Sequence, residues 1–189
     1  MAVRRRRSAD ESRSIILEVA ARRLAEQGLE GLNITGVAEE AGISHATLIH
    51  HFGSSGGMRV ALADKMTMDL IGDLLAAFEQ DVSTTEMTSN VFRALSEGGH
   101  AKLIAWRAVE DNAGGTGPTE ELASSFKKLI ASMHRVMAER DEQDLQNLVM
   151  LVGIAAIGYG LAGGVLAQLI GMDSEAFAAF PGWMTDHIS

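Results

Sequence analysis

Short or flat side chains that can form hydrogen bonds gather between residues 44 and 51, directly after a glycine-centred turn. The turn, Ala41-Gly42-Ile43-Ser44, supplies a small residue, a left-handed residue, an apolar residue and a helix cap. The side chains that follow it and can approach bases or phosphates are His45, Ala46, Thr47, His50 and His51. A helix of this kind is slim and polar enough to enter a DNA major groove, which is about 12 Å wide. The pattern predicts a helix-turn-helix over residues 35–52.

The same residue types do not form a catalytic or metal-binding pattern. The chain has no cysteine, which excludes disulfides, thiol nucleophiles and thiolate metal sites. His50 and His51 are adjacent, and His45 lies six residues before His51, so no two of them share one helix face as metal ligands do. No glycine-rich phosphate loop follows a strand pattern. We therefore expect no enzyme activity, no metal and no cofactor.

Helical periodicity covers most of the chain, and no alternating strand pattern is present. Two short helices are expected to begin at the capping residues Thr35 and Ser44, and the glycine-rich stretch 53–57 is expected to break the second. The other helices are expected near residues 8–27, 58–80, 84–97, 100–112, 119–140, 143–171 and 174–187. The sequence thus predicts an all-α fold with a three-helix N-terminal domain, residues 1–57, and a helical bundle, residues 58–189.

The charge of the chain is unevenly distributed. The formal net charge is −9, but residues 1–60 carry eight Lys or Arg against seven Asp or Glu. The basic run Arg4, Arg5, Arg6 and Arg7 is a candidate arm for a minor groove or for phosphates, and a solvated tail is the alternative. No apolar segment follows the run, so we expect no signal peptide and a cytoplasmic protein.

The segment around the turn resembles the TetR family of transcriptional regulators. The resemblance rests on Ala25-Glu26-Gln27-Gly28, Ile34-Thr35, Ala38-Glu39-Glu40-Ala41-Gly42-Ile43-Ser44 and Thr47-Leu48-Ile49-His50-His51-Phe52. It covers residues 8–62, and beyond these only helix number and length agree.

The resemblance implies a double-stranded DNA partner and assigns contacts to individual positions. Thr35 and His51 would touch phosphates, whereas Leu48 and Phe52 would be core residues. The positions that would contact DNA are Thr35, Gly36, Ser44, His45, Ala46, Thr47, Ile49, His50 and His51.

The chain also departs from the family pattern. Ile49 stands where the family usually has Tyr, Ser55 where it has Lys, and Gly56-Gly57 where it has an acidic pair. Neither Ile nor Ser supplies a charge or an aromatic hydroxyl, so we expect a weaker phosphate contact here, offset by the N-terminal arm.

Residues 145–172 contain no charged side chain, which makes this run long enough to cross a membrane. Internal Gln and Asn residues and acidic flanks without a Lys/Arg bias argue against a membrane span. An intradomain core helix is a second alternative. We favour a homodimer helix, as the resemblance implies, with an interface stripe of small residues: Gly153, Ala156, Gly160, Gly163, Gly164 and Ala167.

Methionine and aromatic residues in the middle helices suggest a pocket for a small apolar effector. The candidate ligand contacts are Met66, Phe78, Trp106, Arg107, His134 and Met137. Ordinary core packing is the alternative for each apolar residue, and a helical ion pair with Glu110 or Asp111 is the alternative for Arg107.

Together these patterns predict a sequence-specific DNA-binding regulator. We expect a repressor that a small ligand releases from a pseudo-palindromic operator, because two copies of one short helix read two related half-sites. The competing hypothesis is a helical protein–protein interaction module that does not bind DNA.

Overall fold

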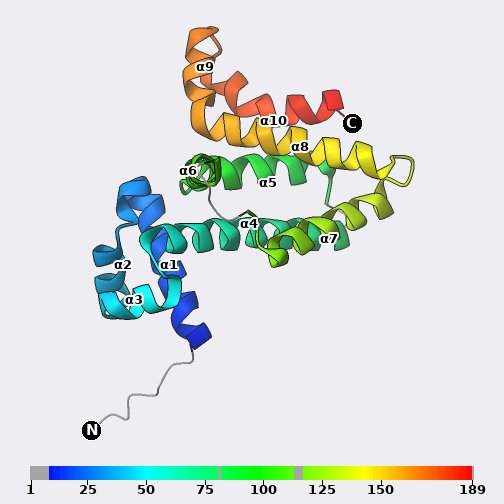
Figure 1. Ribbon diagram of the computed structural model, residues 1–189. Helices are drawn as coiled ribbons and strands as arrows, with labels where there is room; N and C mark the ends of the chain where they lie inside the picture. Colours follow the sequence, from blue (N-terminus) through cyan, green and yellow to red (C-terminus); the bar gives the residue numbers. More distant parts are fainter. Residues whose placement is uncertain (1–8, 81, 113–116, 189) are drawn as a thin grey trace. The chain divides into compact units, whose positions relative to one another are not determined.

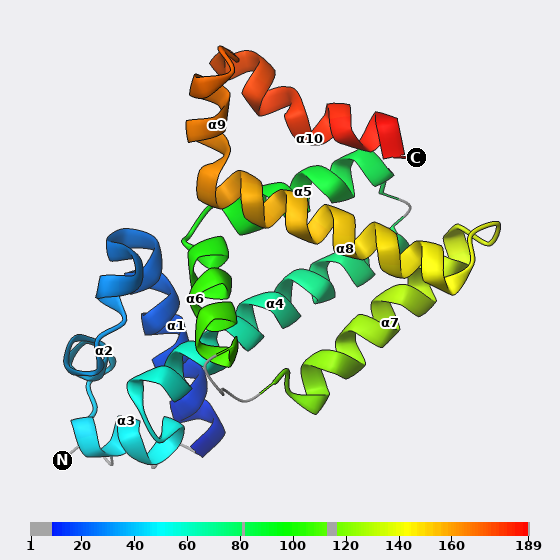
Figure 2. The ribbon, with the colours of Figure 1, turned by 45° about the horizontal axis from the view of Figure 1, so that its top comes forward.

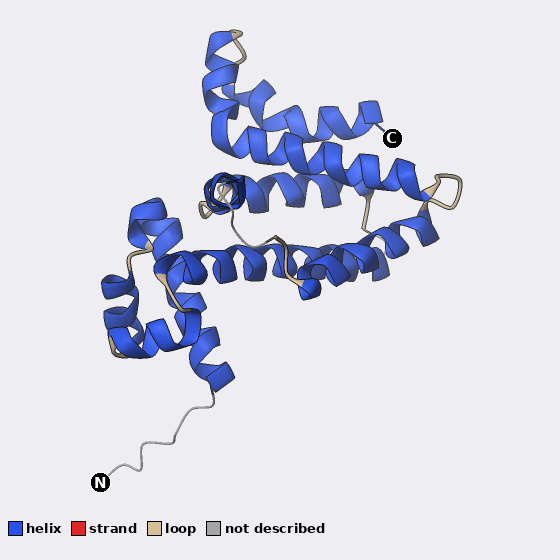
Figure 3. Cartoon of the chain, in the orientation of Figure 1, coloured by secondary structure: helices blue, strands red, loops and turns tan. Residues whose placement is uncertain are grey.

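The computed structural model describes residues 9–80, 82–112 and 117–188, which form helices joined by short loops (Figure 3). By its internal packing the chain divides into two units, Met1–Ala63 and Asp64–Ser189, here called unit 1 and unit 2. No strand occurs in the described ranges, and the all-α prediction is confirmed.

Unit 1 is a small helical domain built around α1 (Figure 1, blue to cyan). On α1, Ile16, Ala20 and Leu24 recur every four residues and are at most 1% exposed, which makes one face of the helix apolar and buried. Leu48 of α3 is also fully buried. The elements are α1 (Ala9–Gln27), a 3₁₀ turn η1 (Gly28–Gly31), α2 (Ile34–Ala41), α3 (His45–Phe52) and the first turns of α4 (Ser55–Glu79).

Local signals set the ends of these short helices. Gly42 ends α2 in the left-handed conformation with φ 68°, and the Ser44 hydroxyl accepts a hydrogen bond from the N–H of Thr47. At the start of α2, however, Asn33 is the cap, and its side chain accepts a hydrogen bond from Gly36 N–H over 2.8 Å. Thr35 lies inside the first turn, so its expected capping role is wrong.

The glycine-rich stretch after α3 is only partly a break. Gly53 ends α3 with φ 75°, but Gly56 and Gly57 already belong to α4. The Ser54 hydroxyl accepts a hydrogen bond from the N–H of Gly57 over 2.9 Å. A Cβ atom on Gly57 would lie 2.1 Å from the carbonyl oxygen of Phe52, whereas one on Gly56 would meet no atom closer than 3.6 Å. Only Gly57 is therefore required by close packing.

Unit 2 is a bundle in which α7 lies beside the C-terminal part of α4 (Figure 2). Ile71 of α4, Leu129 and Met133 of α7, and Leu145 of α8 form one buried cluster. The further elements are α5 (Thr84–Ser96), α6 (His100–Asn112), α7 (Glu120–Val136), α8 (Glu142–Gly158), η2 (Tyr159–Gly163), α9 (Gly164–Leu169) and α10 (Ser174–Ile188).

A π-helical segment, η2, joins α8 to α9, and the helix direction changes there before α10 folds back along α5 (Figures 1 and 2). Tyr159 stacks on Phe177 with ring centroids 4.3 Å apart and donates a hydrogen bond to the carbonyl oxygen of Phe177. Burial raises the pKa of Tyr159. The sequence pattern did not predict this interruption, because a π segment depends on tertiary packing rather than on periodicity.

Candidate DNA-binding surface and ligand cavity

The second helix of the helix-turn-helix, α3, has one buried face and one exposed face. Leu48 is fully buried and Phe52 is half-buried, and together they hold the helix to its unit. The opposite face carries the exposed side chains of His45, Ala46 and His50. These positions are free of the core and offer two imidazole rings for hydrogen bonding.

The first turn of α3 is held by its own hydroxyl groups. Ser44 and Thr47 hydroxyls lie 2.8 Å apart, and the Thr47 N–H donates to the Ser44 hydroxyl over 3.0 Å. Ser44 is exposed and Thr47 is half-buried, as are Ile49 and His51. The cap fixes the first turn, so the side chains beyond it have a defined direction.

The start of α2 has fewer free hydrogen-bond donors for a phosphate than a helix N-terminus usually has. The Thr35 side chain is exposed and accessible there. The N–H of Gly36 is already bonded to Asn33. A Cβ atom on Gly36 would lie 2.4 Å from a guanidinium nitrogen of Arg23, so this glycine leaves room for the arginine. We therefore assign Gly36 a packing role.

Two arginines of α1 are occupied by one carboxylate. Glu40 of α2 accepts from Arg22 at 2.6 Å and from Arg23 at 3.1 Å. Hydrogen bonds from Arg22 and Arg23 lower the pKa of Glu40, and the bond to Glu40 raises the pKa of Arg22. Arg23 also donates to the carbonyl oxygen of Gly31 over 2.8 Å. These cations join α1 to α2, and the group of two arginines and one carboxylate keeps one net positive charge.

Arg13 is a candidate contact that sequence reasoning missed. Its guanidinium carbon lies 4.5 Å above the Phe52 ring, and it donates to the carbonyl oxygen of His51 over 2.9 Å. The side chain is exposed and therefore adds a positive charge at the end of α3. Thirty-eight residues separate Arg13 from His51, so no local motif links them. The predicted arm, Arg4–Arg7, lies outside the described residues.

Ser55 takes a structural part in place of the lysine usual in the resembling family. Its half-buried hydroxyl donates to the carbonyl oxygen of Leu32 over 3.4 Å. The side chain thus points into unit 1.

Unit 2 contains a partly open, largely apolar cavity of about 360 Å³ among α4, α5, α6, α7, α8 and α10. Of the predicted ligand contacts, Phe78 and Met137 line it. Met66, Trp106 and Arg107 do not line it. Arg107 instead forms an ion pair with Asp64. Asp64 is a long-range partner that the pattern of neighbouring acids did not indicate.

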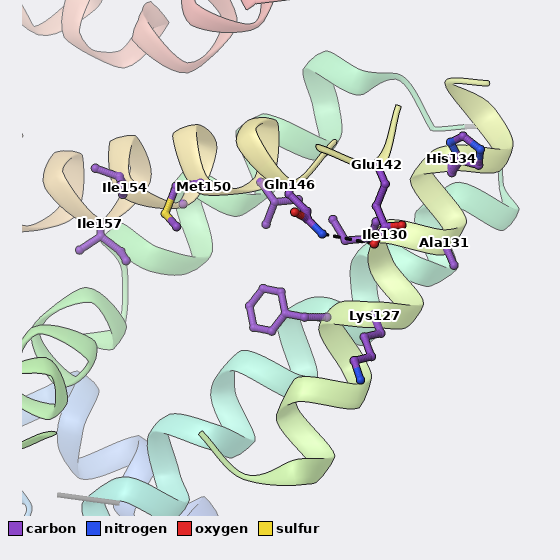
Figure 4. A pocket seen from close by; sticks show the side chains of 12 residues that line it. Lys127, Ile130, Ala131, His134, Glu142, Gln146, Met150, Ile154 and Ile157 are labelled. Carbon is purple, nitrogen blue, oxygen red and sulfur yellow. Dashed lines mark hydrogen bonds between the residues drawn. The ribbon is translucent and has the colours of Figure 1, made fainter. Parts of the chain in front are cut away.

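An open groove of about 750 Å³ runs between α7 and α8. Figure 4 shows Lys127 and His134 on α7, and Gln146, Met150 and Ile154 on α8. Gln146 donates to the carboxylate of Glu142 over 3.2 Å. His134, predicted as a cavity residue, lies at this groove instead.

Comparison with known proteins identifies the helix-turn-helix. Residues 16–62 match the domain described as "Bacterial regulatory proteins, tetR family". The chain is 30% identical over 120 residues to the HTH-type transcriptional regulatory protein RaaS of Mycobacterium tuberculosis (strain ATCC 25618 / H37Rv). That match covers 57% of this chain and 56% of the relative, so the chain spans little more than half of the relative's length.

A solved structure gives the same fold over nearly the whole chain. It is a TetR-family member from Streptomyces coelicolor A3, with a TM-score of 0.54 and 19% identity, covering 94% of this chain and 98% of that one. Residues 16–62 of this chain are a TetR-family helix-turn-helix domain.

The chain exposes an apolar surface on its last helices. The continuous helix Glu142–Leu169 is long enough to cross a membrane, and its most apolar 18-residue stretch has a mean hydropathy of 2.1, yet only 6% of that stretch is buried. A soluble helix of this composition needs a cover. Met150 and Ile154 line the groove. The other exposed apolar side chains on α8, η2, α9, α10 and the adjoining turn, here called the apolar face, are Leu151, Leu161, Val165, Leu166, Leu169, Ile170 and Trp183.

The small-residue stripe lies mostly inside unit 2. Ala156 and Ala167 are buried. Cβ atoms on Gly160 and Gly163 would come within 3.0 Å of α5 and of the Phe177 ring, respectively. These four positions let helices of the same chain approach closely, which corrects their expected place in a dimer interface.

The two remaining stripe positions have open surroundings. A Cβ atom on Gly153 or Gly164 would meet nothing within 4 Å. Gly164 is exposed, and Gly153 lines the groove and the cavity.

Proposed function

We propose that this TetR-family protein is a homodimeric transcriptional repressor that binds a pseudo-palindromic operator and is released by a small, largely apolar ligand. The observation that carries the proposal is the exposed face of α3. His45, Ala46 and His50 lie on this face, outside the core, while the buried Leu48 anchors the helix. A capped, outward-facing short helix is what major-groove recognition requires.

The contacts divide into base and phosphate contacts. His45, Ala46, Thr47 and His50 are assigned to base edges, with imidazole and hydroxyl groups as hydrogen-bond donors and acceptors. Ser44 and Ile49 flank them. Phosphate contacts are assigned to the exposed Thr35 hydroxyl, to His51 and, additionally, to Arg13.

The N-terminal arm, Arg4–Arg7, would add sequence-independent affinity. Its four charges compensate for the Lys that Ser55 replaces. Deleting residues 1–7 should therefore flatten the slope of log affinity against log salt concentration.

We assign the apolar face to the homodimer. Its side chains include Val165, Leu169 and Ile170, which are 61–76% exposed. One recognition helix reads few base pairs, so a twofold pair of such helices supplies the affinity that a single unit lacks. The acidic residues at both ends of α8–α9 and the absence of a Lys/Arg bias favour a protein partner over lipid.

We assign the cavity in unit 2 to the effector. Its volume is within the range of about 300–1,000 Å³ typical of small-molecule sites. Leu, Ile, Met and Phe side chains dominate its wall, and the polar exceptions are a few threonines, including Thr88 and Thr185, and the charged residues Glu139 and Arg140. Such a wall selects an apolar ligand. The ligand shifts the protein toward a non-binding conformation only if it prefers that conformation.

A gel-shift assay with random DNA at low and moderate salt tests the proposal first. A repressor retains a sequence-selected fraction of the DNA at moderate salt, and His50→Ala weakens that retention. Lys102→Ala, on an exposed position of α6, is the matched control and should have no effect. Loss of all retention at moderate salt supports a helical protein–protein interaction module instead.

A further inference from the structure

The groove between α7 and α8 and the apolar cavity of unit 2 share part of their walls. Four positions line both spaces: Phe126, Val149, Gly153 and Ile157. Phe126 is 37% exposed although it lines the cavity. Since a side chain at the boundary faces both solvent and the interior, the two spaces meet at this point.

Gly153 leaves an opening at this boundary. A Cβ atom built on it meets nothing within 4 Å, so the missing side chain is not needed for close packing. Glycine inside a helix costs about 1 kcal/mol relative to alanine, and here no turn or contact explains it. By contrast, Gly160, seven residues later, would place a Cβ 3.0 Å from the backbone of α5.

Both spaces are largely apolar and carry a few polar groups. The cavity wall is mainly aliphatic and aromatic, with Glu139 and Arg140 among its lining residues. The groove carries Lys127, His134, Glu142 and Gln146. Figure 4 shows these four on facing helices, Lys127 and His134 on α7 and the other two on α8. A molecule that reaches from the cavity into the groove stays against apolar side chains and meets the polar groups of the groove at its outer end.

We infer that the groove between α7 and α8 is the entrance of the effector cavity, with Gly153 as the opening and Phe126 as the side chain that partly closes it. The ligand class that fits is an elongated, largely apolar molecule that occupies both spaces and carries a polar group at its outer end, beside the polar side chains of the groove. This inference rests on the proposed effector function of the cavity and adds its route and its ligand class.

Stopped-flow fluorescence with N-phenyl-1-naphthylamine, an apolar dye that brightens in apolar surroundings, tests the entrance in the full-length protein. In Gly153→Leu the added side chain narrows the opening, so association and dissociation rates should both fall by about tenfold, as a barrier higher by about 1.4 kcal/mol would give. The dissociation constant should stay nearly unchanged. Phe126→Ala should raise both rates.

Gly72→Leu is the matched control. Gly72 is an exposed helical glycine of α4 whose Cβ would also meet nothing within 4 Å, and it lines neither space. Gly72→Leu raises the helix propensity as much as Gly153→Leu does, but it changes neither space. Its dye kinetics should therefore equal those of the wild type.

The outcomes separate the entrance from the cavity. Saturable dye binding with unchanged rates in Gly153→Leu overturns the entrance and leaves the effector cavity in place. A loss of affinity with an unchanged association rate likewise overturns it, because Gly153 would then be cavity wall only. If the wild type shows no saturable binding, the effector cavity is contradicted and the entrance with it. A linear alkyl alcohol and its carboxylate, used as competitors, test whether a polar end improves displacement.

Discussion

The guanidinium of Arg107 donates a hydrogen bond to the carboxylate of Asp64 and so joins α6 to α4 across 43 residues of sequence. Both side chains are nearly buried, at 11% and 7% exposure. Arg107 also donates to the carbonyl oxygen of Gly117 over 3.4 Å. The pair thus fixes three segments of unit 2 at one point.

Removing one member of this pair should destabilise the protein strongly. Arg107→Ala leaves a buried carboxylate without its charge partner, which costs about 3–5 kcal/mol in comparable pairs. Urea unfolding at a fixed protein concentration measures the loss. Lys102→Ala, at an exposed position of the same helix, should change the unfolding free energy by less than about 0.5 kcal/mol. Equal effects of the two variants would contradict a structural role of the pair.

The two adjacent glycines of α4 should respond oppositely to alanine. Gly56→Ala gains up to about 1 kcal/mol of helix propensity, because its Cβ meets no atom closer than 3.6 Å. Gly57→Ala should destabilise the protein, because its Cβ would lie 2.1 Å from the carbonyl oxygen of Phe52. Thermal melts of both variants give the comparison. A stabilised Gly57→Ala would show that the close approach is not required.

His100 should make stability depend on pH. Burial lowers the pKa of His100 from 6.5 to about 4, with Asp69 opposing the shift, and the imidazole lies 3.2 Å from the Thr67 hydroxyl. Between these pH values the unfolded chain binds a proton that the folded chain excludes, so stability falls as the pH falls from 6.5 toward 4.

The loss attributable to His100 should be about 2 kcal/mol between pH 7 and pH 5. Urea unfolding of the wild type and of His100→Gln at the two pH values isolates this share. The variant should lose less stability on acidification, whereas His187→Gln, at an exposed position, should behave as the wild type does. If His100→Gln loses as much stability on acidification as the wild type does, the pH dependence comes from other groups.

Arg13 should contribute charge to DNA binding without contributing sequence preference. Arg13→Ala should weaken binding to all sequences and reduce the slope of log affinity against log salt by about 1, as the loss of one phosphate contact does. Arg13→Lys should restore the slope, because it keeps the charge while losing the planar contact with Phe52. Arg93→Ala, on α5 of unit 2, is the control. A slope that Arg13→Ala does not change would limit Arg13 to a structural role.

The apolar face should be covered by a second copy. Val165→Glu places a charge on this face, whereas Val109→Glu places one on α6, and the two valines are similarly exposed, at 61% and 69%. Analytical ultracentrifugation should find a dimer for the wild type and Val109→Glu, and a monomer for Val165→Glu. A monomeric wild type, or one that floats with lipid vesicles, would contradict the dimer.

The sequence predicts the local part of this fold well. Gly42 and Ser44 determine the turn through backbone conformation and capping, which act over a few residues, and the structure confirms both. The start of α2 was missed because Asn33 and Thr35 are both good caps, and only the structure selects between them. The same limit applies to Gly57. It has to be glycine because the end of α3 lies too close for a Cβ atom, and the sequence alone does not show this approach.

Contacts between distant segments could not be predicted from local patterns. Arg107 has acidic neighbours on its own helix, and it also pairs with Asp64. A nearly buried guanidinium needs a charged partner that is shielded from water as well, and Asp64 supplies it. A stripe of small residues shows that something approaches α8 and α9 closely, but it does not show whether that neighbour is the same chain. Gly160 and Gly163 turned out to serve α5 and α10.

In-vitro selection of double-stranded DNA from a random pool tests the recognition role of α3 most directly. The proposed function predicts a recovered site with two related half-sites, whose centres lie about 34–36 Å or a multiple of that distance apart. It also predicts that His45→Ala and His50→Ala relax the preference at particular bases, with a cost of about 1–3 kcal/mol each. Recovery of no common sequence, or of one that neither substitution alters, would contradict the account.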